Sequence, residues 1–189
     1  MPLKTVVKVG NISNLSDARY CSGMGVDMLG FCAIEGQPSY ISPKLFQEIR
    51  GWIPGPKVVA EIYGIPSVEA LAALMKDYAP DYFELSQKEF TTYSPYISIP
   101  CIVSITSTDV TSLKKEEQSI AYLLLEEASL SATTGIDRPS LLKINSHHNL
   151  LEKLQQHAVA GVALSGSHEI RPGFKEYNEL ADILELLDE

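Results

Sequence analysis

The sequence predicts a single domain, spanning residues 1–189, that folds as a small (β/α)8 barrel. Three observations lead to this prediction. Short apolar runs alternate with helical or loop segments along the whole chain, there are eight such runs, and most of them are apolar almost without interruption. Near-continuous apolar runs are typical of parallel strands that are buried on both faces. A doubly wound open sheet is the main alternative.

The eight predicted strands are short and spread along the chain. They span residues 5–11, 28–33, 57–64, 82–86, 100–106, 121–127, 141–146 and 161–167. Parallel strands need a crossover segment between them, so repeated strand–crossover units of this kind favour a barrel.

Several of the intervening segments carry helix start signals. Asn14, Ser42 and Ser67 are residue types suited to the N-cap position, and a proline follows Ser42 at the first helical position. The spacing of apolar residues also predicts a helix over residues 174–189 and a shorter one over residues 149–157.

The length of 189 residues is short for this fold, because a (β/α)8 barrel typically has about 250 residues. The segments after the fourth, fifth and sixth predicted strands are poor in helical periodicity. Residues 90–99 look like a loop, and residues 128–139 have room for little more than one helical turn. We therefore expect shortened crossovers after strands 4 to 6.

Composition excludes several classes of protein. The formal net charge of −9 argues against a nucleic-acid partner, because phosphate backbones are bound by basic surfaces. No apolar run approaches the ~20 residues of a membrane-spanning helix, and the first residues do not resemble a signal peptide. Three cysteines without a signal peptide indicate reduced thiols, so we expect a cytoplasmic protein without a membrane partner.

The segment KVGNISNLSDARYCSGMGVDMLGFCAIEGQPSYISP, residues 8–43, resembles the phosphoribosylanthranilate isomerase family. Ten positions match the family pattern in register: Asn14, Asp17, Ala18, Gly25, Asp27, Gly30, Phe31, Pro38, Ile41 and Pro43. Residues 56–64 and 161–184 also resemble family segments, the latter with one extra residue before Pro172. The resemblance implies a (β/α)8 barrel and an Amadori aldose-to-ketose rearrangement in tryptophan biosynthesis. It implies no cofactor.

That reaction needs a general acid for the ring oxygen and a base for the C2 proton. The family's base is a Cys at the end of the first strand, and the corresponding residue here is Gly10, which has no side chain to act as a base. The family's acid is an Asp after the sixth strand, and its place falls on Glu126, or on Glu127 if the strand slips by one residue. The family's Lys is kept as Lys8, which strand alternation points inward with Gly10.

The expected ligand-binding positions also differ from the family pattern. Ser39 replaces an Arg that faces the anthranilate part of the substrate. The family's glycine-rich phosphate loops correspond to a segment containing Gly135, to Ser146 and to Ser165-Gly166, of which only the last keeps the family pattern. Glycines at such loops let backbone N–H groups approach phosphate oxygens.

Two further side chains are weaker candidates for proton transfer. Cys32 lies next to the position of the missing family Cys, although a cysteine in a strand is more often a small buried apolar residue. His168 follows the eighth strand, and His147 and His148 follow the seventh. No metal-binding spacing connects these histidines, so we expect no metal site.

Three hypotheses for function remain open at this stage. The first is a diverged isomerase homologue that binds a small ligand, such as a sugar phosphate, at the C-terminal mouth of the barrel. The second is an active phosphoribosylanthranilate isomerase, which would be an intramolecular isomerase that uses a base other than the family's Cys. The third is a non-catalytic interaction or regulatory barrel. Whether the chain is an enzyme is left open, and either a monomer or a homodimer fits the sequence.

Overall fold

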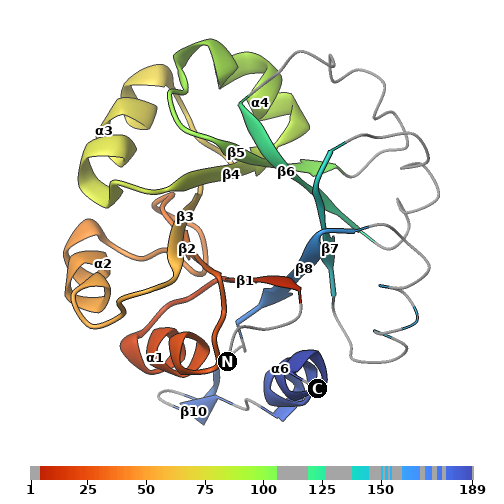
Figure 1. Cartoon of the computed structure of the whole chain (residues 1–189). Helices are drawn as coiled ribbons and strands as arrows, with labels where there is room; N and C mark the ends of the chain where they lie inside the picture. The colour runs from red at the N-terminus through yellow and green to blue at the C-terminus, as the bar shows by residue number, and fades with distance from the viewer. Residues whose placement is uncertain are drawn as a thin grey trace.

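The computed structural model shows a closed barrel of eight parallel strands in the order β1 to β8 (Figure 1). The structure describes residues 5–105, 119–126, 138–144, 150, 152, 154, 159–166, 169–171, 174–175 and 178–188. β1 pairs with β2 on one side and with β8 on the other, both in parallel, and this closes the barrel. The (β/α)8 prediction is therefore confirmed, and the open doubly wound sheet is excluded.

All eight predicted strands are present, with ends that differ by a few residues. They are β1 (Val6–Gly10), β2 (Met28–Cys32), β3 (Lys57–Glu61), β4 (Tyr82–Ser86), β5 (Cys101–Ile105), β6 (Ile120–Leu125), β7 (Ser140–Lys143) and β8 (Gly161–Ser165).

The helices surround the barrel on its outside (Figure 1). They are α1 (Leu15–Gly23), α2 (Pro43–Arg50), α3 (Val68–Tyr78), α4 (Gln87–Tyr93) with the 3-10 turn η1 (Ser94–Tyr96), and α6 (Asn178–Asp188). The three predicted N-caps are confirmed. The side chains of Asn14, Ser42 and Ser67 each accept a hydrogen bond from a backbone N–H of the first turn.

Two predictions from the sequence are wrong in detail. Residues 90–99 are not simply a loop, because α4 and η1 occupy much of this segment. The helix begins at Gln87, because Ser86 and Glu89 form a capping box at its N-terminus. The C-terminal helix begins at Asn178 rather than at residue 174, because Phe174–Lys175 forms β10, which pairs antiparallel with β9 (Glu169–Arg171).

The other predicted crossovers lie outside the described residues. The segments 106–118 and 127–137 follow β5 and β6, and most of the predicted helix over 149–157 is also outside. Among the described helices, none is long and apolar enough to cross a membrane.

Strand alternation divides the apolar residues into two cores. One core lies between the barrel and its helices and takes the outward residues of each strand, such as Val7, Phe31 and Leu85. The second core fills the barrel interior on the side away from the carboxyl ends of the strands. It consists of inward-facing residues, namely Met28, Val59, Ile102, Leu124, Leu141 and Ala163. The inward positions nearer the C-terminal ends of β1, β3 and β4 carry charged residues instead, and these positions form the site described below.

At Gly161, the backbones of β8 and β1 lie too close together for a side chain. A Cβ at this position would overlap the backbone carbonyl of Val6, whose carbon would be only 2.7 Å away. Because backbone atoms of a closed barrel cannot move aside cheaply, we expect Gly161→Ala to lower the free energy of unfolding by about 3 kcal/mol.

Urea unfolding measures this change. Gly23→Ala is the matched control, because a Cβ at Gly23 meets no atom within 4 Å, and it should change stability by less than about 1 kcal/mol. Equal stability of the two variants would contradict the assigned strand packing.

Candidate functional site

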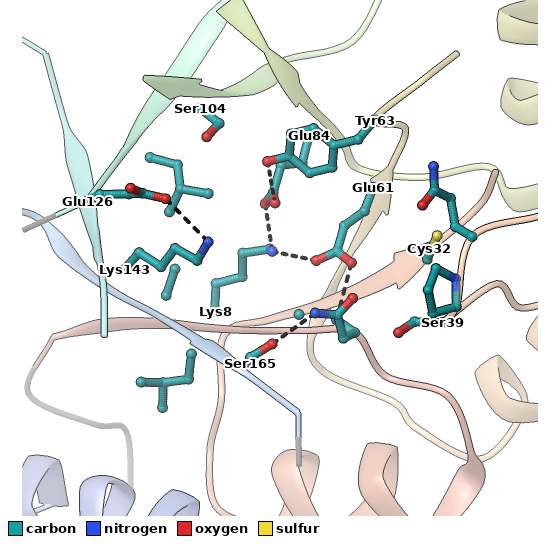
Figure 2. Close-up of a pocket in the computed structure, with 17 residues that line it drawn as sticks. Lys8, Cys32, Ser39, Glu61, Tyr63, Glu84, Ser104, Glu126, Lys143 and Ser165 are labelled. Carbon is teal, nitrogen blue, oxygen red and sulfur yellow. Dashed lines mark hydrogen bonds and ion pairs between the residues drawn. The ribbon is translucent and has the colours of Figure 1, made fainter. Parts of the chain in front are cut away.

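A pocket of about 480 Å³ opens at the C-terminal ends of the strands, which is the face where (β/α)8 barrels hold their active sites (Figure 2). Each of the eight strands contributes at least one lining residue at or near its carboxyl end, including Lys143 of β7 and Ser165 of β8. The lining residues are Lys8, Gly10, Asn11, Cys32, Gln37, Pro38, Ser39, Glu61, Tyr63, Glu84, Ser104, Leu124, Glu126, Lys143, Ala163, Leu164 and Ser165.

A buried charge cluster, formed by Lys8, Glu61 and Glu84, makes the floor of this pocket (Figure 2). The Lys8 ammonium lies 2.7 Å from Glu61 Oε1 and 2.6 Å from Glu84 Oε2. The three residues are 3%, 6% and 3% exposed. Burial alone would lower the pKa of Lys8, but the charges of Glu61 and Glu84 outweigh it and raise that pKa above its ordinary value.

Glu61 is held by two donors. Its Oε1 accepts a hydrogen bond from the Lys8 ammonium, and its Oε2 accepts one from the backbone N–H of Asn11 at 3.1 Å. Asn11 has a positive φ of 55°, a conformation that Asn adopts more readily than most residues. This turn after β1 aims the Asn11 N–H at the carboxylate.

Glu84 is held less completely. Its Oε1 accepts a hydrogen bond from the Tyr63 hydroxyl at 2.9 Å. Its Oε2 is buried beside the Lys8 ammonium but makes no hydrogen bond of good direction among the described residues. Burial raises the pKa of Glu84; the positive charge of Lys8 opposes this shift, and the negative charge of Glu61 adds to it. Burial and the charge of Glu84 also raise the pKa of Tyr63.

The charges of the cluster do not balance if both carboxyl groups are ionised. One ammonium then faces two carboxylates in a buried position, where an uncompensated charge is costly. A single proton on one of the carboxyl groups restores neutrality. The raised pKa of Glu84 makes this residue the better holder of that proton.

Gly10 and Gly30 supply the room for the Glu61 carboxyl group. A Cβ at Gly10 would overlap Glu61 Oε1 and would lie 2.9 Å from Lys8 Nζ. A Cβ at Gly30 would overlap the same oxygen and would lie 2.9 Å from Glu61 Cδ. Gly30 therefore faces the barrel interior rather than a helix, and Gly10 leaves space for a neighbouring carboxylate.

The Ser165–Gly166 corner is partly used within the protein. Ser165 Oγ accepts a hydrogen bond from the Asn11 side chain at 2.8 Å. The backbone N–H of Gly166 donates to the Gly10 carbonyl at 2.7 Å, so this N–H is already occupied. Ser165, a predicted ligand-binding residue, lines the pocket, whereas Gly166 contributes to packing against β1.

Glu126, the predicted general acid, directly follows β6 and lines the pocket. It lies 3.6 Å from the ammonium of Lys143, and about half of each side chain is exposed to solvent. Figure 2 shows this ion pair on one side of the pocket, with Glu61 on the other side of Lys8. Ser39, the predicted ligand contact, also lines the pocket near Cys32 (Figure 2).

Cys32 lies at the pocket wall but is poorly suited to act as a base. Burial raises the pKa of its thiol, a backbone hydrogen bond with Ile34 opposes this shift, and the charge of Glu61 adds to it. The net increase disfavours the thiolate, which is the basic form. Cys101 begins β5 at the other end of the barrel, and burial raises the pKa of its thiol to about 12.

Several predicted site residues cannot be placed. His168, Gly135 and Ser146 lie outside the described residues, as do His147, His148 and the alternative acid Glu127. Among the residues that the structure describes, no group of three or more His, Cys, Asp or Glu side chains is arranged to hold a metal ion.

The sequence analysis did not identify Glu61, Tyr63 or Glu84 as site residues. A signal for the two carboxylates was present. Glu61 and Glu84 are charged residues inside otherwise apolar buried strands, and they are direct partners in the β3–β4 register. A charge in such a strand needs a counter-charge, and Lys8 was already predicted to point inward.

The barrel is similar to solved structures of phosphoribosylanthranilate isomerases. The Thermus thermophilus enzyme matches with a TM-score of 0.77 and 19% sequence identity, covering 95% of this chain and 96% of that chain. The Thermotoga maritima enzyme matches with a TM-score of 0.74 and 18% identity, covering 96% and 97%. A phosphoribosylanthranilate isomerase in complex with reduced 1-(o-carboxyphenylamino)-1-deoxyribulose 5-phosphate matches with a TM-score of 0.75 and 18% identity, covering 96% and 97%.

At this level of identity the matches show a shared fold, and a shared fold does not by itself show a shared reaction. No protein-family model matches the sequence, and no curated protein matches it. The nearly complete mutual coverage also means that the Thermus enzyme is about as long as this chain, so the short length is common to both.

The steric link between Gly10 and Glu61 can be measured by a double-mutant cycle. We expect Gly10→Ala to destabilise the protein, because a methyl group there displaces a carboxyl group that Lys8 and Asn11 hold in place. In a Glu61→Ala background the same substitution should cost much less, giving an interaction energy of about 1–3 kcal/mol in urea unfolding. Additive effects would contradict the proposed link.

The raised pKa of Glu84 predicts a pH dependence of stability. The folded protein keeps this proton at pH values where the unfolded chain, with a pKa near the ordinary 4.5, has lost it. The contribution of Glu84 to stability therefore falls as the pH rises from the unfolded pKa through the raised folded pKa. Glu84→Gln cannot ionise, so its stability relative to wild type should increase with pH over this window. Parallel pH profiles in urea unfolding would contradict the shift.

Proposed function

We propose that this chain is a diverged homologue of the phosphoribosylanthranilate isomerases, with a mouth that binds a small, sugar-like ligand and without the parent enzyme's base. The observation that carries the proposal is the position of the Glu61 carboxyl group. It occupies the space that a side chain at Gly10 would need. The resemblance in sequence places the family's catalytic Cys at Gly10, and in this chain the Glu61 carboxyl group takes up the space beside Gly10.

The polar lining of the pocket supports a hydroxyl-rich ligand. Asn11, Gln37, Ser39, Tyr63, Ser104 and Ser165 bring uncharged hydrogen-bonding side chains to the wall. Hydroxyl and amide groups of this kind can donate and accept hydrogen bonds, as a polyol or sugar requires. A related isomerase structure contains a deoxyribulose 5-phosphate derivative, which is a ligand of the same general class.

A phosphate group on the ligand is supported less strongly. The Gly166 N–H, which the sequence pattern offers as a phosphate donor, is bonded to the Gly10 carbonyl. Lys143 is the partly exposed cation among the described lining residues, and its ammonium is already paired with Glu126. A binding test therefore needs both a phosphorylated and an unphosphorylated sugar.

An active isomerase with another base is the second candidate. Cys32 does not favour it, because its thiol pKa is raised. The carboxyl groups of the buried charge cluster do favour it, since they lie at the pocket floor. A non-catalytic barrel is favoured least, because apolar side chains would fill the same interior at lower cost than buried charges.

The parent activity is the direct test. We expect the wild-type gene not to rescue a tryptophan auxotroph that lacks the isomerase, and the purified protein to show no turnover of phosphoribosylanthranilate. We also expect Gly10→Cys not to restore activity, because Glu61 occupies the space around the new thiol and Ser39 replaces the substrate-facing Arg. The Thermus thermophilus enzyme serves as the positive control.

Two results would contradict this proposal. One is near-parental turnover by Gly10→Cys alone. The other is rescue by the wild-type gene that is lost in Glu126→Ala, because this would show a working isomerase with its acid in the family position.

A further inference from the structure

We propose that Glu84 and Glu61 form an acid–base pair that shares one proton beside Lys8 and moves protons on a hydroxyketone or hydroxyaldehyde ligand in the pocket. This inference rests on the proposed function, since it requires a sugar-like ligand at the mouth. It goes beyond that function because it assigns chemistry to residues of β3 and β4 that do not correspond to the family's base or acid positions.

The geometry places one cation between two carboxyl groups. Lys8 Nζ contacts Glu61 Oε1 at 2.7 Å and Glu84 Oε2 at 2.6 Å, and both carboxyl groups line the pocket. The groups that act on Glu84 are Lys8 from β1, Glu61 from β3 and Tyr63 from the segment after β3 (Figure 2). Ser104 from β5 lines the same pocket and interacts with Tyr63. With both carboxyl groups ionised, the three residues carry a net charge of −1, and one proton shared by the carboxyl groups makes the cluster neutral.

The two carboxyl groups are held in different ways. Glu61 accepts hydrogen bonds from Lys8 and from the Asn11 N–H, and both donors stabilise its ionised form. Glu84 Oε2 has no well-directed hydrogen bond among the described residues, although it is buried. Glu84 is therefore suited to start as the acid and Glu61 to start as the base.

A proton-transfer step on such a ligand then balances. Glu61 takes the proton from the carbon next to the ligand carbonyl, and the electrons of that C–H bond form a carbon–carbon double bond. The electron pair of the carbonyl double bond moves to its oxygen, which takes the proton of Glu84. The product is an enediol, Glu61 is now protonated and Glu84 is ionised. The total charge of the cluster is unchanged, and Lys8 faces an ionised carboxylate before and after the step.

Lys8 and Tyr63 are positioning residues in this scheme. Lys8 compensates the negative charge on either carboxyl group, so moving the proton between them requires no new counter-charge. Tyr63 directs Glu84 through its 2.9 Å hydrogen bond. A purely structural ion cluster would need neither access to the pocket nor a second carboxyl group, because one carboxylate suffices to neutralise Lys8.

The first experiment counts the proton on the resting protein. Infrared spectra in D2O near neutral pH should show the band of a protonated, buried carboxylic acid in wild type. Glu84→Gln should remove this band. In Glu61→Gln the band should also disappear, because Lys8 then faces a single carboxyl group, which ionises. Glu48→Gln, an exposed residue of α2, is the matched control and should leave the band unchanged.

The second experiment follows proton transfer on two probes, D-ribulose and D-ribulose 5-phosphate. Proton NMR in D2O should show deuterium entering at the carbon next to the carbonyl in the presence of wild type and of Glu48→Gln. Glu84→Gln and Glu61→Gln should each slow this exchange by about 10²–10⁴-fold, with their folds checked by circular dichroism. Calorimetry with the same two compounds measures binding separately and shows whether the phosphate group matters.

The outcomes separate this inference from the proposed function. Failure of both probes to bind wild type would overturn the proposed function. Binding without deuterium exchange, or exchange that survives in either glutamine variant, would overturn the acid–base pair alone. Absence of a protonated carboxylic acid in wild type would also overturn it, because the scheme begins with Glu84 as the acid.

Discussion

The buried positive charge of Lys8 is the constraint on which the rest of the site depends. An ammonium inside a barrel needs anionic partners, and Glu61 and Glu84 provide them from two neighbouring strands. The Glu61 carboxyl group in turn needs space, which exists because β1 and β2 carry glycine at the two positions it approaches. It also needs a second donor, and the turn at Asn11 supplies a backbone N–H. Without the ammonium, both buried carboxyl groups would lack a counter-charge.

The charged groups of this pocket lie on other strands than the family resemblance predicts. The family resemblance points to the ends of β1 and β6 for a base and an acid. In the structure, Gly10 offers no functional group, and Glu126 is half exposed and paired with Lys143. The buried carboxyl groups of the pocket lie on β3 and β4 instead. Because all carboxyl strand ends of a (β/α)8 barrel face one pocket, functional groups can move between strands without a change of fold.

The lower part of the barrel shows why such a shift is tolerated. Below the charge cluster the interior is filled by an apolar layer that includes Met28, Ile102 and Leu141, and the helices pack on the outward faces of the same strands. These contacts hold the barrel closed without help from the pocket. The mouth can therefore carry polar groups that cost stability, since the two apolar cores supply the driving force for folding.

The sequence alone determined the eight parallel strands, because burial on both faces makes each of them an apolar run, and this pattern is local. The closure of these strands into a barrel followed from the pairing of β1 with β8. The sequence also determined the N-caps at Asn14, Ser42 and Ser67, where one side chain serves the first turn of its own helix. Only the tertiary structure decided that Lys8, Glu61 and Glu84 meet, and that Gly10 is empty because Glu61 fills its space. These contacts join residues more than 50 positions apart, as for Lys8 and Glu61, and depend on strand register and side-chain reach. Local sequence patterns specify neither the strand register nor the reach of a side chain, so these contacts could be identified only in the closed barrel.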